Sequence, residues 1–196
     1  GLISGGYLLM LNANRPGKNA LRILAALETY RPARLQEYSL ALVGFSDSLM
    51  EHVRRRYPWA ARLVVPIPFV EHAALPALYR GALGLLFPSL SEGFGYPPLE
   101  AMYYGTPSLC ANVTAIPEVV GDAALYFNPY SLPEIAYRLL HFVSEPELRQ
   151  SLMDRGSARV AEILGRRERM VSGFARYLFG EWSGRPEDGG QQSALR

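Results

Sequence analysis

The chain has 196 residues, of which 49% are hydrophobic, and a formal net charge of +2 at neutral pH. This length suits one domain of ordinary size, which can bury a core without disulfide or metal staples. The nearly balanced charge argues against a nucleic-acid-binding surface, because such surfaces carry a basic stripe.

Short apolar runs alternate with amphipathic stretches along the chain. The apolar runs predict six β-strands, over Tyr7–Leu11, Tyr38–Val43, Leu63–Ile67, Leu83–Phe87, Pro107–Ala111 and Leu125–Phe127. The amphipathic stretches predict helices over Asn19–Leu27, from Asp47 as N-cap toward Tyr57, and over Ala73–Arg80, Leu132–Val143, Glu147–Leu164 and Glu168–Leu178. This alternation predicts an α/β fold, a Rossmann-like doubly wound parallel sheet of about six strands with helices on both faces.

The most informative stretch is Ser89–Gly105, which directly follows the predicted strand Leu83–Phe87. Gly93 and Gly95 let the backbone turn sharply and approach a ligand without a Cβ in the way. The prolines that follow are tolerated in a first helical turn, and Gly105 suits the end of that helix. The segment therefore predicts a strand, a glycine-rich loop and a helix N-terminus, whose free N–H groups suit a phosphate. In a doubly wound sheet this loop lies at the carboxyl edge, where ligands bind.

Two glutamates flank this loop. Glu92 lies at its mouth, and Glu100 lies on the first turns of the following helix. Carboxylates accept hydrogen bonds from sugar hydroxyls well. Either glutamate alone is explained better by a structural role, Glu100 complementing the helix dipole and Glu92 facing solvent. Both together, around a glycine-rich loop after a buried strand, favour a binding site.

A basic turn between the first predicted strand and helix is the second candidate. Arg15 and Lys18 flank Pro16 and Gly17 there, and the two cations could hold a diphosphate, Arg15 as a fork and Lys18 as a point charge. An exposed basic turn without a ligand fits the pattern equally well. The spacing differs from a P-loop, which needs other glycines and a Ser or Thr after the lysine.

Taken in order, these segments resemble the C-terminal domain of family 4 retaining glycosyltransferases, which have the GT-B fold, over about residues 7–177. Pro88–Met102 is similar to the family's Glu-x7-Glu signature, with Glu92 as the first glutamate and Glu100 as the second. Three further segments are similar to neighbouring family motifs: Leu78–Ala82 before the signature, Ala111–Ala124 after it, and Asn14–Asn19, which matches the basic loop on the donor diphosphate.

The resemblance implies that the matching positions bind a nucleotide-diphosphate sugar, the donor substrate. Arg15 and Lys18 would neutralise the diphosphate and Glu92 would contact the donor sugar, which makes these three the catalytic residues. The donor would also contact Gly93, Phe94, Gly95, Leu99 and Glu100, with Glu100 on the ribose hydroxyls. Such enzymes work without a metal ion or other cofactor, so the cations and the helix end meet the charge on the leaving group.

The resemblance also implies how the chain is organised. Residues 1–182 would form the nucleotide-sugar-binding half of a GT-B enzyme, and residues 183–196, rich in Gly, Gln and Ser, a disordered tail. A separate N-terminal domain, absent from this chain, would bind the acceptor, a glycan or a lipid-linked sugar. We therefore expect this chain alone to bind nucleotide without transferring sugar.

The single cysteine bears on the compartment. Cys110 cannot form an internal disulfide, which indicates a reducing compartment, and its apolar neighbours predict a small core residue. We expect a cytoplasmic protein, at the inner membrane surface where the acceptor is a lipid-linked sugar, with no nucleic-acid partner.

Other functions stay open on the sequence. A sugar-nucleotide epimerase shares the two-domain architecture, although it lacks a Glu-Gly-Phe-Gly loop such as residues 92–95. The chain could also be a non-catalytic nucleotide-sugar-binding module of a larger assembly. A dehydrogenase domain is disfavoured, because no G-x-G-x-x-G follows the first predicted strand. The motifs leave the base and sugar of the donor open between GDP-mannose, UDP-glucose and other nucleotide sugars.

Overall fold

The computed structural model describes residues 2–179, and in the last helix it describes side chains up to Arg166. The strands are β1 (Tyr7–Met10), β2 (Ser39–Val43), β3 (Val64–Ile67), β4 (Gly84–Phe87), β5 (Ser108–Ala111) and β6 (Ala124–Phe127). The α-helices are α1 (Ala20–Tyr30), α2 (Asp47–Arg56), α3 (Leu75–Gly81), α4 (Tyr96–Tyr103), α5 (Ile116–Val120), α6 (Leu132–Ser144) and α7 (Pro146–Phe179). All six predicted strands are confirmed, each to within one residue at either end.

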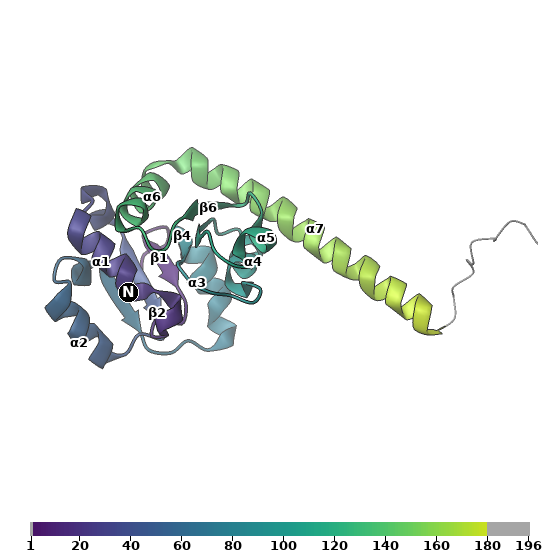
Figure 1. Cartoon of the computed structure of the whole chain (residues 1–196), viewed down its shortest axis with the longest axis horizontal. Coiled ribbons are helices and arrows are strands. Elements are labelled where there is room, and N and C mark those ends of the chain that lie inside the picture. The colour runs from purple at the N-terminus through teal and green to yellow at the C-terminus, as the bar shows by residue number, and fades with distance from the viewer. Residues whose placement is uncertain (1, 180–196) are drawn as a thin grey trace, which may run out of the picture. The chain divides into compact units, whose positions relative to one another are not determined.

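The six strands form one sheet in the order β3-β2-β1-β4-β5-β6, and every neighbouring pair is parallel. Figure 1 labels β1, β2, β4 and β6 of this sheet. The predicted parallel α/β fold is therefore confirmed. The order reverses beside β1, because the chain builds outward through β2 and β3 and then returns to place β4 on the other side of β1. The loops that leave β1 and β4 run in opposite directions from neighbouring strands, which makes this the topological switch point where doubly wound sheets bind ligands.

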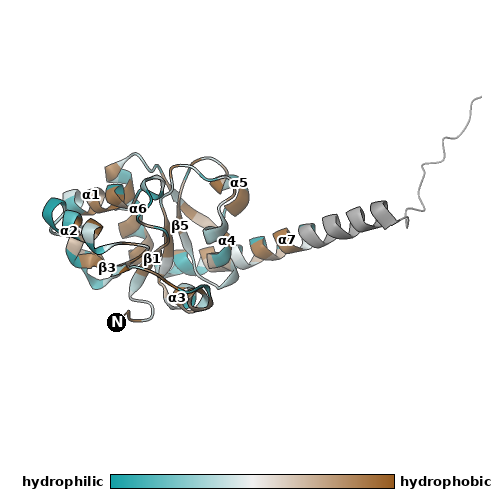
Figure 2. Ribbon diagram, turned by 90° about the horizontal axis from the view of Figure 1, so that it is seen from below, coloured by the Kyte–Doolittle hydropathy of each residue, from teal (hydrophilic) through white to brown (hydrophobic). Residues whose placement is uncertain are grey.

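Helices cover both faces of the sheet. Figure 2 shows strands of the sheet between α1 and α6 on one side and α3 on the other. Because neither face meets water, the strands are continuous apolar runs, and β1, β4 and β5 are buried along their whole lengths. Cys110 in β5 is fully buried, and burial raises the pKa of its thiol, as expected of a core residue.

Several helix ends differ from the sequence predictions. The N-cap of α2 is Ser46 and not Asp47, since the Ser46 hydroxyl accepts the Leu49 amide at 3.3 Å. Asp47 is the first helical residue, where its carboxylate still complements the helix dipole. Helix α5 was absent from the prediction, because its five residues are too few to show a period.

The two helices predicted over residues 147–164 and 168–178 are one continuous helix, α7. The gap between the two predicted helices begins at Gly165, and a glycine inside a helix costs only about 1 kcal/mol relative to alanine and need not end it. Helix α4 ends at Tyr103, and Gly105 just beyond it has a φ of +72°, the left-handed conformation that favours glycine after a helix.

By its internal contacts the chain divides into two units, residues 1–160 and 161–196. The sheet and helices α1–α6 lie in the first unit, and α7 begins in the first unit and continues into the second. The predicted domain end at residue 182 and the predicted tail over 183–196 lie outside the described residues. Over residues 2–179, no helix has both the length and the apolar character to cross a bilayer.

A glycine in β4 lets the sheet pack closely against α6. A Cβ built on Gly84 would lie 2.4 Å from Cζ of Phe142, whose side chain is fully buried, and 3.0 Å from the carbonyl oxygen of Pro107. Gly84→Ala should therefore destabilise the fold by about 1–3 kcal/mol, as overpacking of cores does. Urea denaturation measures this change in the free energy of unfolding.

Gly17→Ala is the matched control, because a Cβ there meets no atom within 4 Å and the backbone φ lies outside the left-handed region. Its free energy of unfolding should stay close to that of the parent. Equal stability of the two variants would show that the ring of Phe142 can move aside without cost.

Candidate functional site

The site is built where the loop after β1 meets the loop after β4. The amide of Leu90 donates to the carbonyl of Gly17 at 2.9 Å, so the two backbones touch. The ammonium of Lys18 forms an ion pair with the carboxylate of Glu92, which lies 74 positions further along the chain. The two loops that the sequence analysis singled out separately are therefore one site, at the carboxyl edge beside the switch point.

Lys18 is held firmly in this site. Its side chain is only 16% exposed and that of Glu92 17%, and the ammonium also lies 5.1 Å from the ring centroid of Phe87 at the end of β4. A cation over an aromatic face gains further stabilisation from the ring. Lys18 is also the only lysine among the 20 basic residues of the chain. Lys18 is therefore not an exposed side chain, whereas binding of a ligand by this turn stays a prediction.

Arg15 differs from Lys18. Its side chain is exposed and makes no hydrogen bond or ion pair with any residue of the described chain. The backbone around it is nevertheless ordered by a short 3-10 turn over Pro16–Lys18, with bonds from the Arg15 amide to the Asn12 carbonyl at 3.1 Å and from the Lys18 amide to the Arg15 carbonyl at 2.9 Å. Arg15 can thus reach an anion above the loop but is not fixed in advance.

The glycine-rich loop leads directly into α4. Gly95 precedes the helix with a φ of +96°, a conformation that an L side chain rarely adopts, so glycine is required there. Gly93 lies outside that region, and a Cβ on it would meet no atom within 4 Å. Of the two glycines, only Gly95 has a conformation that favours glycine, while the predicted close approach of a ligand to both stays a prediction. Between them, Phe94 is 41% exposed, and its ring lies 4.9 Å from that of Tyr96.

Glu100 lies in α4, which follows the glycine-rich loop directly, and its side chain has one fixed partner. The hydroxyl of Tyr79, a buried residue of α3, donates to Oε2 of Glu100 at 2.7 Å. Burial raises the pKa of the Tyr79 hydroxyl, and the hydrogen bond to Glu100 raises it further. Leu99, next to Glu100, is partly buried and packs against the core.

Three residues that hold the site were missed by the sequence analysis. Tyr79 was read only as part of a matching helix segment. Thr114, after β5, accepts the Glu92 amide at 3.1 Å and fixes the mouth of the loop. Asn19 has a left-handed φ of +63° and is buried, and its side-chain amide donates to the Pro129 carbonyl at 3.1 Å. Its signals in the sequence were its place in the matching segment Asn14–Asn19 and its position before a helix, where a cap is common.

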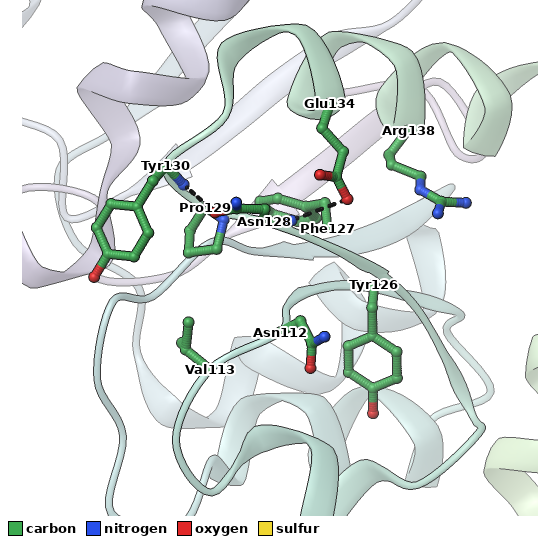
Figure 3. Close-up of a pocket in the computed structure, with 9 residues that line it drawn as sticks. All are labelled: Asn112, Val113, Tyr126, Phe127, Asn128, Pro129, Tyr130, Glu134 and Arg138. Atoms are coloured by element: carbon green, nitrogen blue, oxygen red, sulfur yellow. Dashed lines mark hydrogen bonds between the residues drawn. The ribbon is translucent and has the colours of Figure 1, made fainter.

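A polar cavity of about 520 Å³ adjoins these loops at the carboxyl ends of β5 and β6. Figure 3 shows Glu134 and Arg138 of α6 on one side of it and Asn112, Val113 and Tyr126 on the other. The remaining lining residues are Phe127, Asn128, Pro129 and Tyr130. None of the predicted site residues lines this cavity, but Asn19 and Thr114 connect the site loops to its walls.

The arrangement suits an anionic ligand that also carries hydroxyl groups. Lys18, Arg15 and the N-terminus of α4 place positive charge at one edge, which attracts a diphosphate. Pro97 and Pro98 in the first turn of α4 carry no N–H, so the amides at this edge come from the residues just before them. Glu92 and Glu100 flank the same loop and offer oxygens to hydroxyl donors.

Comparison with known proteins bears on this chemistry. The family model described as "Glycosyl transferases group 1" matches residues 5–159. The chain is 35% identical over 163 residues to O-antigen chain mannosyltransferase B of Escherichia coli, a match covering 80% of this chain and 42% of that protein. It is 46% identical over 127 residues to O-antigen chain mannosyltransferase RfbU of Salmonella typhimurium, covering 63% of this chain and 34% of that protein.

A solved structure shares the fold. Sucrose-phosphate synthase from Thermosynechococcus elongatus superposes with a TM-score of 0.74 at 22% identity, covering 90% of this chain and 46% of that one. The chain thus spans less than half the length of each of these three proteins. Since the family model covers most of the chain, including both site loops, the chain belongs to the group 1 glycosyltransferases.

Proposed function

We propose that this chain is the donor-binding, C-terminal half of a retaining family 4 glycosyltransferase of the GT-B fold. It binds a nucleotide-diphosphate sugar, and the glycosyl group passes with retention to an acceptor held by a separate N-terminal domain. The observation that carries this proposal is the Lys18–Glu92 ion pair, which places an ammonium and a carboxylate side by side at the switch point, before the N-terminus of α4.

In this proposal the diphosphate lies over the N-terminus of α4, beside Lys18. As the bond from the anomeric carbon to the phosphate oxygen breaks, negative charge builds on that oxygen. Lys18, Arg15 and the amides of Phe94 and Gly95 stabilise the charge, which is electrostatic catalysis by groups already in place. Lys18 and Glu92 are in contact, so adjacent groups of one donor can reach both of them. The phosphate, which is negative, meets the ammonium, and the sugar hydroxyls meet the carboxylate.

The names of the relatives extend the proposal to a substrate class. Both O-antigen relatives are named as mannosyltransferases. We propose mannose as the sugar transferred and a saccharide chain or a lipid-linked sugar as the acceptor, with the enzyme in the cytoplasm at the inner membrane surface. A metal ion is unnecessary in this scheme, because the side-chain cations and the helix N-terminus supply the positive charge.

Calorimetric titration of the chain with GDP, UDP, ADP and NAD tests the donor site. One nucleoside diphosphate should bind and NAD should not. Glu100→Ala should weaken that binding by about 1–3 kcal/mol, the cost of losing a charge-assisted hydrogen bond. Mixed with donor and acceptor, the chain alone should transfer no sugar, since the group that orients the acceptor is missing.

The outcome separates the proposal from its rivals. Preference for NAD would identify a dehydrogenase domain. Interconversion of the free nucleotide sugar, without an acceptor, would identify an epimerase half. Nucleotide binding without turnover in the intact two-domain protein would identify a non-catalytic module.

The two glycines of the loop should respond differently to the same substitution. Gly95→Ala should destabilise the fold by about 1–2 kcal/mol, because alanine is strained at its φ of +96°. Gly93→Ala should leave the free energy of unfolding within about 0.5 kcal/mol of the parent. If the donor lies against Gly93, that variant should still lose nucleotide affinity, which calorimetry measures. Unchanged affinity in a stable Gly93→Ala protein would place the donor elsewhere.

Lys18 should matter more in the transition state than in the bound donor. In the intact two-domain enzyme, Lys18→Ala should lower kcat by about a hundredfold, as removal of one preorganised electrostatic partner does. Lys18→Arg should restore kcat only in part, because a planar fork does not replace a compact ammonium. Arg31→Ala is the control, since the Arg31–Glu28 pair is partly exposed and lies away from both site loops. A raised KM with unchanged kcat would mean that Lys18 stabilises the bound donor and the transition state equally.

The single lysine offers a direct binding readout as well. Selective ¹³C labelling of lysine yields one side-chain signal for the whole chain, because Lys18 is its only lysine. That signal should shift on addition of a nucleoside diphosphate and much less on addition of the nucleoside alone. Equal shifts with both ligands would mean that Lys18 does not contact phosphate.

A further inference from the structure

A buried phenol holds the carboxylate that the proposed function assigns to the ribose. Tyr79 belongs to α3 and is 1% exposed, yet its hydroxyl reaches Oε2 of Glu100 on α4 at 2.7 Å. The bond joins two helices on either side of the glycine-rich loop. A buried hydroxyl needs a partner, and a carbonyl group would serve as well as a carboxylate. What requires explanation is that its partner is a group at the ligand-binding edge.

The Tyr79 ring is clamped so that its hydroxyl has little freedom. It stacks on the ring of Tyr104, with centroids 5.5 Å apart and planes inclined by 23°. The guanidinium of Arg80 in turn lies 4.9 Å from the centroid of the Tyr104 ring. The Tyr79 carbonyl accepts the hydroxyl of the buried Thr106 at 2.7 Å. Ring and backbone are therefore fixed by the segment that follows α4, and the hydroxyl points at one oxygen of Glu100.

The direction of this bond is also fixed. Burial raises the pKa of the Tyr79 hydroxyl far above the physiological range, so the proton stays on tyrosine and Glu100 accepts. The bond occupies Oε2, whereas Oε1 accepts no hydrogen bond from the residues that the structure describes. Glu100 thus presents one committed oxygen and one available oxygen in a fixed orientation.

We infer that Tyr79 is a positioning residue that orients Glu100 toward the ribose of the nucleotide, and that it thereby makes the site select ribonucleotides over 2′-deoxyribonucleotides. The inference rests on the proposed function, since it takes Glu100 as the ribose-binding carboxylate. A site built to accept hydrogen bonds from two vicinal hydroxyls rejects an analogue that lacks one, because the carboxylate then loses a donor. A freely rotating carboxylate could turn to the remaining hydroxyl and would discriminate less.

Calorimetry with four probes tests this inference: GDP, UDP and their 2′-deoxy forms. For whichever base binds, the parent chain should prefer the ribonucleotide by about tenfold, the value of one good hydrogen bond to a charged group. In Tyr79→Phe, which removes one hydroxyl and keeps the ring, that preference should fall to about twofold or less. Affinity for the 2′-deoxy form should change little, and this distinguishes a positioning role from general damage to the site.

Tyr104→Phe is the matched control. Its ring stacks on that of Tyr79, but its hydroxyl makes no hydrogen bond with the described residues, so the ribose preference should equal that of the parent. Glu100→Gln is a second variant that does not depend on the folding of Tyr79→Phe. If Tyr79 donates to the amide oxygen of the substituted side chain, the neutral NH₂ faces the ribose and donates to a hydroxyl oxygen in place of accepting from it. The preference should then fall, because the bond to a charged acceptor is lost.

Three results would overturn the inference. A parent chain that binds ribo- and deoxyribonucleotides equally would show that Glu100 does not hold the ribose, while nucleotide binding itself and the proposed function would stand. An unchanged preference in a folded Tyr79→Phe protein would leave the hydroxyl a purely structural role. A preference retained in full in Glu100→Gln would mean that a charged acceptor at this position is not what recognises the ribose. Absence of any nucleotide binding would instead refute the proposed function, and this inference with it.

Discussion

The ion pair between Lys18 and Glu92 depends on β1 and β4 being neighbours in the sheet. Each residue lies in the loop that follows its strand, and 74 positions of chain separate them. Strand order alone brings them together, since β2 and β3 extend the sheet on one side of β1 before β4 is added on the other. Helices cover both faces of the sheet, so a ligand reaches the side chains of these loops only at the carboxyl edge.

An ion pair in so sheltered a position is a weak contributor to stability. Removing two charges from water costs about as much as their attraction returns, so a well-packed apolar pair would serve the fold as well. The pair is therefore better explained by ligand binding than by stability of the fold. A ligand anion can pair with the Lys18 ammonium while a ligand hydroxyl donates to the Glu92 carboxylate. A nucleotide-diphosphate sugar offers both groups within one molecule.

The strands and their parallel arrangement were predictable, because burial on both faces leaves a continuous apolar run that reads directly from the sequence. The residue types of the site were predictable as well, since glycines, cations and carboxylates stand out after an apolar strand. Their pairing was not, because contact between Lys18 and Glu92 follows from strand order. Nor was the difference between Gly93 and Gly95, since backbone dihedrals at two glycines two residues apart are set by how the chain enters α4.

The role of Tyr79 was the hardest to predict from the sequence. A tyrosine among apolar residues of a helix is expected in the core, and its ring is indeed buried there. Only its hydroxyl is functional in our account, and the direction of a hydroxyl has no pattern along the chain. The same limit applies to Thr114, whose hydroxyl holds the Glu92 amide from the loop after a different strand.

Each of the two glutamates is held by one side chain from elsewhere in the chain. Glu92 is committed to Lys18 and Glu100 to Tyr79, and both partners come from an earlier segment of the same unit. Each carboxylate is thereby aimed before a ligand arrives, which lowers the entropy lost on binding. None of these contacts requires a second domain. Under the proposed function, this unit alone therefore holds every contact that orients the nucleotide, and the acceptor is bound elsewhere.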